Sequence, residues 1–209
     1  MKIIFRKIDN WLVKKLLLLR RHLDYRQNLL LNQHIAEITQ GDKDKIHFEN
    51  PFFLIGEENI QFLGKFYALP GTRIECFNNY SGIQLHPKLI IGNGVIMNYY
   101  CHIGVINEVI IGDNVLFGSH VLVTDHQHGI FNEKQKNLPW TERPLSSKGP
   151  VHIEDNVWLG DNVCVMPGVT IGKGSVIGAN SVVTHNIPSY SMAVGIPAKV
   201  IKRVNDNLT

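Results

Sequence analysis

The sequence lacks the features that mark several large classes of protein. Its 209 residues hold only three cysteines, Cys76, Cys101 and Cys164, which are widely spaced and odd in number. This excludes a disulfide framework and a zinc site built from cysteine alone, and it suits a reducing cytoplasm. Glycine and proline follow no three-residue period, so a collagen is excluded. A hydrophobic content of 44% excludes a disordered chain.

A long apolar run is also missing from the N-terminal segment. Its longest uninterrupted apolar run is residues 16–19, whereas a membrane-spanning helix needs about 20 apolar residues. Charges break the apolar stretch and no small-residue cleavage site follows, so a signal peptide is not predicted either. We therefore expect a cytoplasmic protein, with peripheral contact to the inner membrane face left open.

Positive charge is concentrated at the N-terminus. Residues 1–35 carry eight Lys or Arg against two Asp or Glu, while the rest of the chain is net negative. Apolar residues recur there at helical spacing, at Trp11, Leu12, Leu16, Leu19 and Leu23. This predicts a basic amphipathic helix that packs on the main domain or a neighbouring subunit, or lies on an anionic membrane surface. No nucleic-acid partner is predicted, because the basic residues cluster on one helix without an aromatic platform.

A six-residue repeat dominates the remaining sequence. An aliphatic residue, position one of the unit, returns every six residues in three runs. These residues are Leu85, Ile91, Met97 and Ile103, then Ile111, Phe117 and Val123 after a slip of two residues, then Ile153, Leu159, Val165, Ile171, Ile177 and Val183. A helix would place them on different faces, so the period indicates a repeat architecture.

Other positions of the unit explain how it folds. Position two is often Gly, position four is mostly Gly or Asn, and position five is small or β-branched. Gly and Asn tolerate left-handed backbone, which implies one sharp corner per unit. Three strand-and-corner units make a triangular coil, and stacked coils bury their aliphatic residues along the axis. The sequence thus predicts an all-β solenoid.

The runs IGDNVLFGSHVLV (111–123), NVWLGDNVCVMPGVTIGKGSVIGANSVVT (156–184) and VGIPAKVIK (194–202) carry a family likeness. They resemble the hexapeptide-repeat acyltransferases, and within them the galactoside and maltose O-acetyltransferases and those acting on bacterial surface polysaccharides. The resemblance covers residues 85–203. It implies a left-handed parallel β-helix, a homotrimer with active sites between subunits, and acetyl-CoA as co-substrate without a metal. Residues 36–84 are expected to form degenerate first coils or a cap.

One interruption of the repeat is a candidate site. Residues 124–150 are too hydrophilic for the interior and are expected to protrude as a loop, and long loops in compact domains are usually functional. At its start, Thr124-Asp125-His126 matches the setting of the family's essential histidine. The resemblance implies that His126 is the general base, a role that suits neutral imidazole. Asp125 and His128 are candidate substrate contacts, and we expect Asp125, as a sequence neighbour in an extended chain, to point away from His126.

A second carried-over residue is Asn98. The stretch Met97–Cys101 resembles one in sugar acetyltransferases whose first Asn contacts the acceptor hydroxyl. This sequence departs from that pattern with Tyr100 at the second Asn and with Ile106 where those enzymes carry a pyranose-binding acid. A larger glycan or lipid-linked sugar is therefore the more plausible acceptor.

The resemblance also implies a groove for the donor. The positions that match family residues near the pantetheine arm or the phosphates of CoA are Trp158, Gly160, Asp161, Ala179, Thr184, His185, Lys199 and Lys202.

We expect an acetyl-CoA-dependent O-acetyltransferase that modifies a sugar hydroxyl in a bacterial surface polysaccharide pathway (lipopolysaccharide, capsule or exopolysaccharide). Acetylation of a small molecule, an oligosaccharide or an antibiotic, is the alternative. A γ-class carbonic anhydrase is more distant, with His102, His120, His126 and His128 as possible metal ligands. A non-catalytic scaffold is the remaining class.

Overall fold

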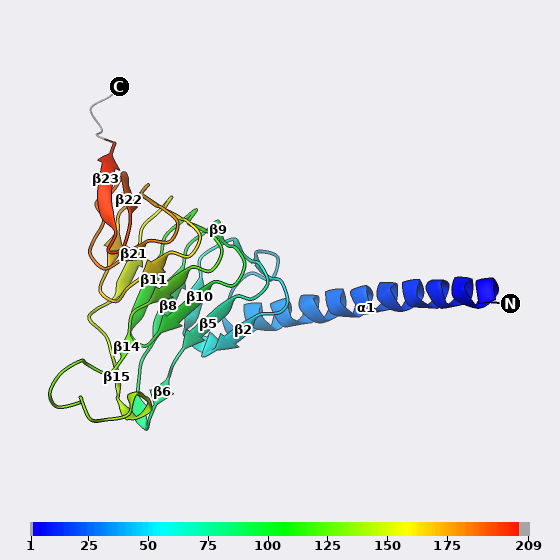
Figure 1. Ribbon diagram of the computed structural model, residues 1–209, viewed down its shortest axis with the longest axis horizontal. Helices are drawn as coiled ribbons and strands as arrows, with labels where there is room; N and C mark the ends of the chain where they lie inside the picture. The colour runs from blue at the N-terminus through cyan, green and yellow to red at the C-terminus, as the bar shows by residue number, and fades with distance from the viewer. Residues whose placement is uncertain (1, 205–209) are drawn as a thin grey trace.

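The computed structural model describes residues 2–204, with side chains described from residue 12 onwards, so the predicted Trp11 side chain lies outside that part. The chain forms a stack of short strands that begins beside a long helix and ends at the C-terminus (Figure 1). Successive strands join three sheets in rotation, and every pair within them is parallel except β22 with β23. The predicted solenoid of parallel strands with an N-terminal helix is confirmed.

Three sheets form the walls of the solenoid. The eight-stranded sheet contains β1 (Ile46–Phe48), β4 (Phe66–Ala68), β9 (Val95–Met97), β12 (Leu116–Phe117), β17 (Trp158–Leu159), β20 (Val176–Ile177), β22 (Ser191–Val194) and β23 (Lys199–Arg203). The six-stranded sheet contains β2 (Phe53–Ile55), β5 (Arg73–Cys76), β10 (His102–Val105), β13 (Leu122–Thr124), β18 (Cys164–Val165) and β21 (Val182–Val183). The five-stranded sheet contains β3 (Ile60–Phe62), β8 (Lys88–Ile91), β11 (Glu108–Ile111), β16 (Val151–Ile153) and β19 (Thr170–Ile171). A single 3-10 turn, η1 (Glu57–Asn59), precedes β3.

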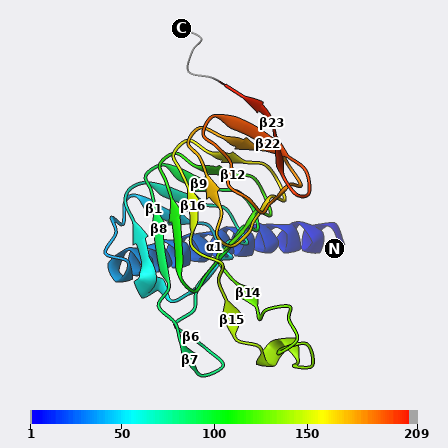
Figure 2. The ribbon, with the colours of Figure 1, turned by 90° about the vertical axis from the view of Figure 1, so that its left-hand side faces the viewer.

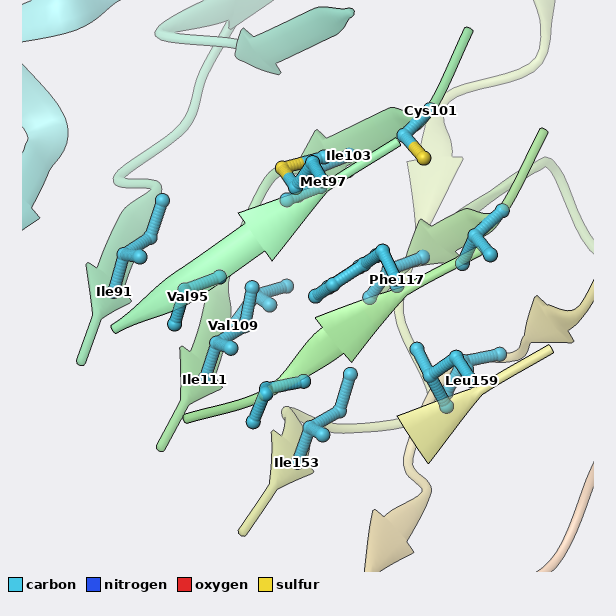
Figure 3. Packing of buried hydrophobic residues seen from close by; sticks show 14 of the residues in the cluster. Ile91, Val95, Met97, Cys101, Ile103, Val109, Ile111, Phe117, Ile153 and Leu159 are labelled. Atoms are coloured by element: carbon cyan, nitrogen blue, oxygen red, sulfur yellow. The ribbon is translucent and has the colours of Figure 1, made fainter. Parts of the chain in front are cut away.

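Strand register follows the six-residue repeat. Met97 pairs with Phe117, Phe117 with Leu159, and Leu159 with Ile177, all at position one. These side chains are almost completely buried and stack along the axis of the solenoid (Figure 3). Each coil alone would expose its apolar side chains, so stacking supplies most of the stability.

Backbone conformation confirms the predicted corners. Asn114, Asn156, Asn162 and Asn180 at position four have φ between 55° and 59°, as do Tyr100 and His120 in the same position. Gly118 at position two has another reason to be glycine, because a Cβ there would lie 2.6 Å from the backbone nitrogen of Asp161 in the next coil. Close stacking of coils therefore demands it.

The helix α1 (Lys2–Ile38) closes the first coil and then extends away from the stack (Figure 1). Ile35 and Ala36 are buried against the core. The Asn32 side chain accepts a hydrogen bond from Phe48 N at 2.7 Å and donates one to Phe48 O at 3.0 Å. The open edge of the first coil is thus paired by a side chain.

The slip of two residues in the repeat has a structural cause. It falls at the corner between β10 and β11, where Ile106 and Asn107 are the additional residues. The prediction that Leu85 occupies position one was wrong. Residues 77–87 leave the stack, and the core positions of the next strand are Leu89 and Ile91.

Two excursions leave the solenoid between the six-stranded and five-stranded sheets. The first carries the hairpin of β6 (Asn79–Tyr80) and β7 (Ile83–Gln84), between β5 and β8. The second follows β13 and carries the antiparallel pair β14 (Gln127–His128) and β15 (Leu145–Ser146), with the 3-10 turn η2 (Trp140–Glu142) between them. Both lie on one side of the stack (Figures 1 and 2). Between them lies the corner that contains Ile106 and Asn107.

The part of α1 beyond the first coil presents many apolar side chains to solvent. Leu16, Leu17, Leu18 and Leu19 are each more than half exposed. Among the described residues, no helix is both long enough and apolar enough to span a membrane.

Candidate active site

His126 lies just after β13, where the second excursion begins. Its Nδ1 is 3.0 Å from Asp125 Oδ1 and 3.2 Å from the Thr124 hydroxyl. A carboxylate can only accept, so Nδ1 carries the hydrogen and Nε2 keeps a free lone pair. The imidazole is thereby oriented with a proton-accepting nitrogen away from Asp125.

Asp125 is buried completely, with 0% exposure. Its carboxylate accepts hydrogen bonds from the backbone N–H of Ile106 at 3.0 Å and of Asn107 at 2.7 Å, in addition to His126. The expectation that Asp125 points away from His126 was wrong, because the chain bends at residue 125 and is no longer extended. Burial also leaves this carboxylate without access to an acceptor, so the predicted substrate contact is replaced by orientation of the imidazole.

The first excursion contributes two aromatic side chains beside these groups. The Phe77 ring meets the His126 ring edge-on, with 5.8 Å between centroids. The Tyr80 hydroxyl lies 3.1 Å from Nδ1 of His128, which is exposed on β14. Sequence reasoning missed Phe77 and Tyr80. The stretch Asn78–Gly82, polar and turn-rich like residues 124–150, is the signal that could have revealed a second excursion.

Most predicted donor residues gather around a hollow on the eight-stranded sheet. This hollow has a volume of about 380 Å³ and is lined by Trp158, Gly160, Asp161, Ala179, Met192 and Val194, among others. Lys199 pairs with Val194 and Lys202 with Met192 across β22 and β23, which brings both lysines to its edge. Thr184 and His185 lie instead after β21 of the six-stranded sheet, where the Thr184 hydroxyl is 2.8 Å from His185 Nδ1.

Two of the predicted donor residues also have a role in the stacking of coils. Asp161 Oδ1 accepts a hydrogen bond from Ser119 N at 2.8 Å, and Asp113 makes the same contact to Asn93 N at 2.7 Å. A Cβ on Gly160 would lie 2.7 Å from Ala179 N. Coil packing thus explains both residue types at these positions.

Asn98 follows β9, at the corner between the eight-stranded and six-stranded sheets. It is half-buried, and its side chain has no hydrogen-bond partner among the described residues. The amide group is therefore available to a ligand.

A single chain does not bring the two sets of residues together. Thr124, which precedes His126, ends a strand of the six-stranded sheet, whereas Trp158 and Gly160 belong to the eight-stranded sheet and its corner. Across residues 2–204, no group of three or more His, Cys, Asp or Glu side chains is placed to hold a metal ion.

Family models and related proteins match this chain. Residues 150–185 match the model of the bacterial transferase hexapeptide (six repeats), and residues 108–130 match the hexapeptide repeat of succinyl-transferase. The chain is 38% identical over 159 residues to WbbJ of Escherichia coli, named as a lipopolysaccharide biosynthesis O-acetyl transferase, covering 74% of this chain and 77% of that protein. It is 33% identical over 172 residues to a galactoside O-acetyltransferase of Lactococcus lactis, covering 82% and 73% respectively.

A solved structure shows the same fold. It is AntD, an N-acyltransferase from Bacillus cereus in complex with dTDP-4-amino-4,6-dideoxyglucose and coenzyme A. Its TM-score is 0.61 at 17% identity, and the match covers 77% of this chain and 82% of that one. With the two relatives above covered over more than two thirds of their length, this chain belongs to the hexapeptide-repeat acetyltransferases and is an acyltransferase.

Proposed function

We propose that this protein transfers the acetyl group of acetyl-CoA to a hydroxyl of a saccharide during assembly of a bacterial surface polysaccharide. The relatives named for lipopolysaccharide biosynthesis and for galactoside acetylation support this acceptor class. The observation that carries the proposal is the His126 imidazole, held through Nδ1 by a buried carboxylate so that Nε2 is free to accept a proton.

The reaction follows from this geometry. Nε2 of His126 takes the proton of the acceptor hydroxyl as its oxygen attacks the carbonyl carbon of the thioester. Asp125 stabilises the imidazolium that forms, as a buried carboxylate does in other imidazole-based sites. The tetrahedral intermediate collapses, the C–S bond breaks, and the CoA thiolate receives the proton from the imidazolium. Asn98 and His128 are proposed to contact the acceptor.

The donor is proposed to occupy the hollow on the eight-stranded sheet. Trp158, Gly160, Asp161 and Ala179 line it, and Lys199 and Lys202 at its edge supply positive charge for the CoA phosphates. Thr184 and His185, on the six-stranded sheet, are proposed contacts along the path of the donor. Acyl-CoA is also the ligand class of the structural neighbours crystallised with coenzyme A.

The chain is proposed to act as a homotrimer. His126 and the donor hollow lie on two different walls of one solenoid, so a complete site needs the hollow of one subunit to face the imidazole of another. The family resemblance further implies that the coil is left-handed and that residues 124–150 protrude over the shared site.

Contact of α1 with an anionic membrane is a further part of the proposal. Leu16 and Leu18 are more than 60% exposed, and Lys14, Arg20 and Arg21 flank them. Apolar and basic side chains on one helix favour a surface of anionic lipid. The protein should sediment with vesicles that contain phosphatidylglycerol at low salt and not with neutral vesicles. Remaining in the supernatant with both would contradict this part.

Isotope-labelled acetyl-CoA supplied with a panel of saccharides tests the main proposal. The wild type should transfer label to at least one saccharide. His126→Ala should lower kcat by about 10²-fold or more while the trimer persists, as for loss of a general base. His152→Ala, which removes an imidazole from the outer face of the five-stranded sheet, is the matched control. Near-normal turnover by His126→Ala, or no labelled saccharide from the wild type, would overturn the proposal.

A further inference from the structure

Three polar side chains form a cluster on the outer face of the six-stranded sheet, close to His126. Glu75 Oε2 lies 2.8 Å from Nε2 of His102 and 3.2 Å from Nε of Arg73. Nη2 of Arg73 lies 3.0 Å from Nδ1 of His102. The three groups come from neighbouring strands, β5 and β10, where Arg73 pairs with His102 in register.

The chemistry of the cluster defines its protonation. A guanidinium only donates, so Nδ1 of His102 must accept from Arg73. A carboxylate only accepts, so Nε2 of His102 carries the hydrogen and donates it to Glu75. The imidazole is therefore neutral, in agreement with burial and the nearby charge of Arg73, which hold the pKa of His102 below its ordinary value. With one positive and one negative group, the cluster has no net charge.

A glycine separates this cluster from the catalytic group. Glu75 pairs with Gly104, which pairs with Thr124. A Cβ on Gly104 would lie 3.1 Å from Cε1 of His126 and 3.6 Å from Nε2 of His102. Gly104 does not have positive φ, so no turn requires it. It leaves a gap in the sheet surface that both imidazoles border.

One carboxylate oxygen of Glu75 remains available. Both contacts of this side chain go to Oε2, and no donor from the described residues reaches Oε1. The Glu75 side chain is 13% exposed and that of His126 is 11% exposed. Both groups are thus reachable but largely desolvated, which strengthens any hydrogen bond that a ligand makes there.

We propose that Glu75 binds the acceptor. Its free Oε1 accepts a hydrogen bond from a hydroxyl of a neutral saccharide, while the neighbouring ring hydroxyl lies at Nε2 of His126. Arg73 and His102 hold the carboxylate in place, and Phe77, next along the chain, offers an apolar surface to the sugar ring. This inference rests on the proposed function and names a specificity-determining residue of the same site.

The test compares Glu75→Gln with a chemically matched control. Glu108 joins Lys88 at 3.0 Å and His152 at 3.4 Å, the same set of carboxylate, cation and imidazole, but on the five-stranded sheet. Kinetics are measured with acetyl-CoA and those methyl glycosides that the wild type acetylates. Glu75→Gln should raise the acceptor KM by about tenfold or more, the usual cost of losing a hydrogen bond to a charged group. Glu108→Gln should leave the acceptor KM within about threefold of the wild type.

Deoxy analogues of the same glycosides sharpen the comparison. The analogue that lacks the hydroxyl bound by Glu75 should react equally well with the wild type and with Glu75→Gln, because the interaction is already absent. Should Glu75→Gln fail to fold or assemble, Glu75→Asp carries the test, since its shorter side chain withdraws the carboxylate and should raise the same KM.

The outcomes separate the two proposals. If the wild type acetylates no saccharide, the proposed function fails and this inference fails with it. If the wild type is active but the acceptor KM of Glu75→Gln equals that of the wild type, only the role of Glu75 is overturned. A changed pH profile of kcat with an unchanged acceptor KM would also overturn it, because the cluster would then act through His126.

Discussion

The substitution Asp125→Asn tests whether the buried carboxylate orients the base. In the native protein this group accepts three N–H donors, from Ile106, Asn107 and His126, at 3.0, 2.7 and 3.0 Å. Asparagine offers one acceptor oxygen, and its NH₂ group must face at least one of those donors. Either a backbone N–H loses its partner or the imidazole must change tautomer.

Both consequences have a magnitude. An unpaired buried N–H costs about 1–3 kcal/mol. For a chain of this size that corresponds to a fall in Tm of roughly 2–12 °C. If the imidazole takes the tautomer with hydrogen on Nε2, the base is lost and kcat falls by about 10²- to 10⁴-fold. The KM for acetyl-CoA should stay near its native value, because the donor hollow lies on another sheet.

The assay is release of CoA thiol with a saccharide acceptor, combined with thermal unfolding. Asp113→Asn is the matched control, since Asp113 also accepts a backbone N–H, from Asn93 at 2.7 Å, but contacts no imidazole. A kcat of Asp125→Asn within about threefold of the wild type would refute the reasoning. The carboxylate would then only hold the corner that contains Ile106 and Asn107.

Two further predictions concern titratable groups. The folded-state pKa of His102 is lowered by burial and by Arg73, so the unfolded chain binds more protons. The contribution of His102 to stability is therefore complete above pH ~6.5 and is lost as pH falls toward its folded pKa. His102→Gln should narrow the difference in Tm between pH 7.5 and pH 5.0, and an unchanged difference would contradict this. Burial raises the pKa of the Cys101 thiol to about 11, so iodoacetamide at pH 8 should label the partly exposed Cys164 first, as read by peptide mass spectrometry. Equal labelling of both would show that the coils open.

The regular part of the fold could be predicted because its information is local. Each unit of six residues contains its own strand, its own corner and its own buried side chain. Asn156, Asn162 and Asn180 therefore specify left-handed corners, whatever surrounds them. Leu85 shows the limit of this reasoning, since it matches the period but lies in an excursion outside the core.

The candidate site could be predicted only in part. The position of His126 followed from the break in the repeat and the family likeness. Its partner Asp125 was expected to point away, because alternation holds only while the chain stays extended. Phe77 and Tyr80 were missed because they reach the site from a coil about 50 residues earlier in the sequence.

By itself, the sequence determined the stacked coils, the three-sided core, the N-terminal helix and the place of the interruption at residue 124. These properties follow from patterns that repeat within a few residues. Only the tertiary structure decided that Asp125 is buried beneath the corner at residues 106–107, that Glu75 and His126 share the gap above Gly104, and that donor and base lie on different walls. The physical reason is that stacking brings together residues 20 to 50 positions apart, and no period in the sequence specifies which side chains then meet.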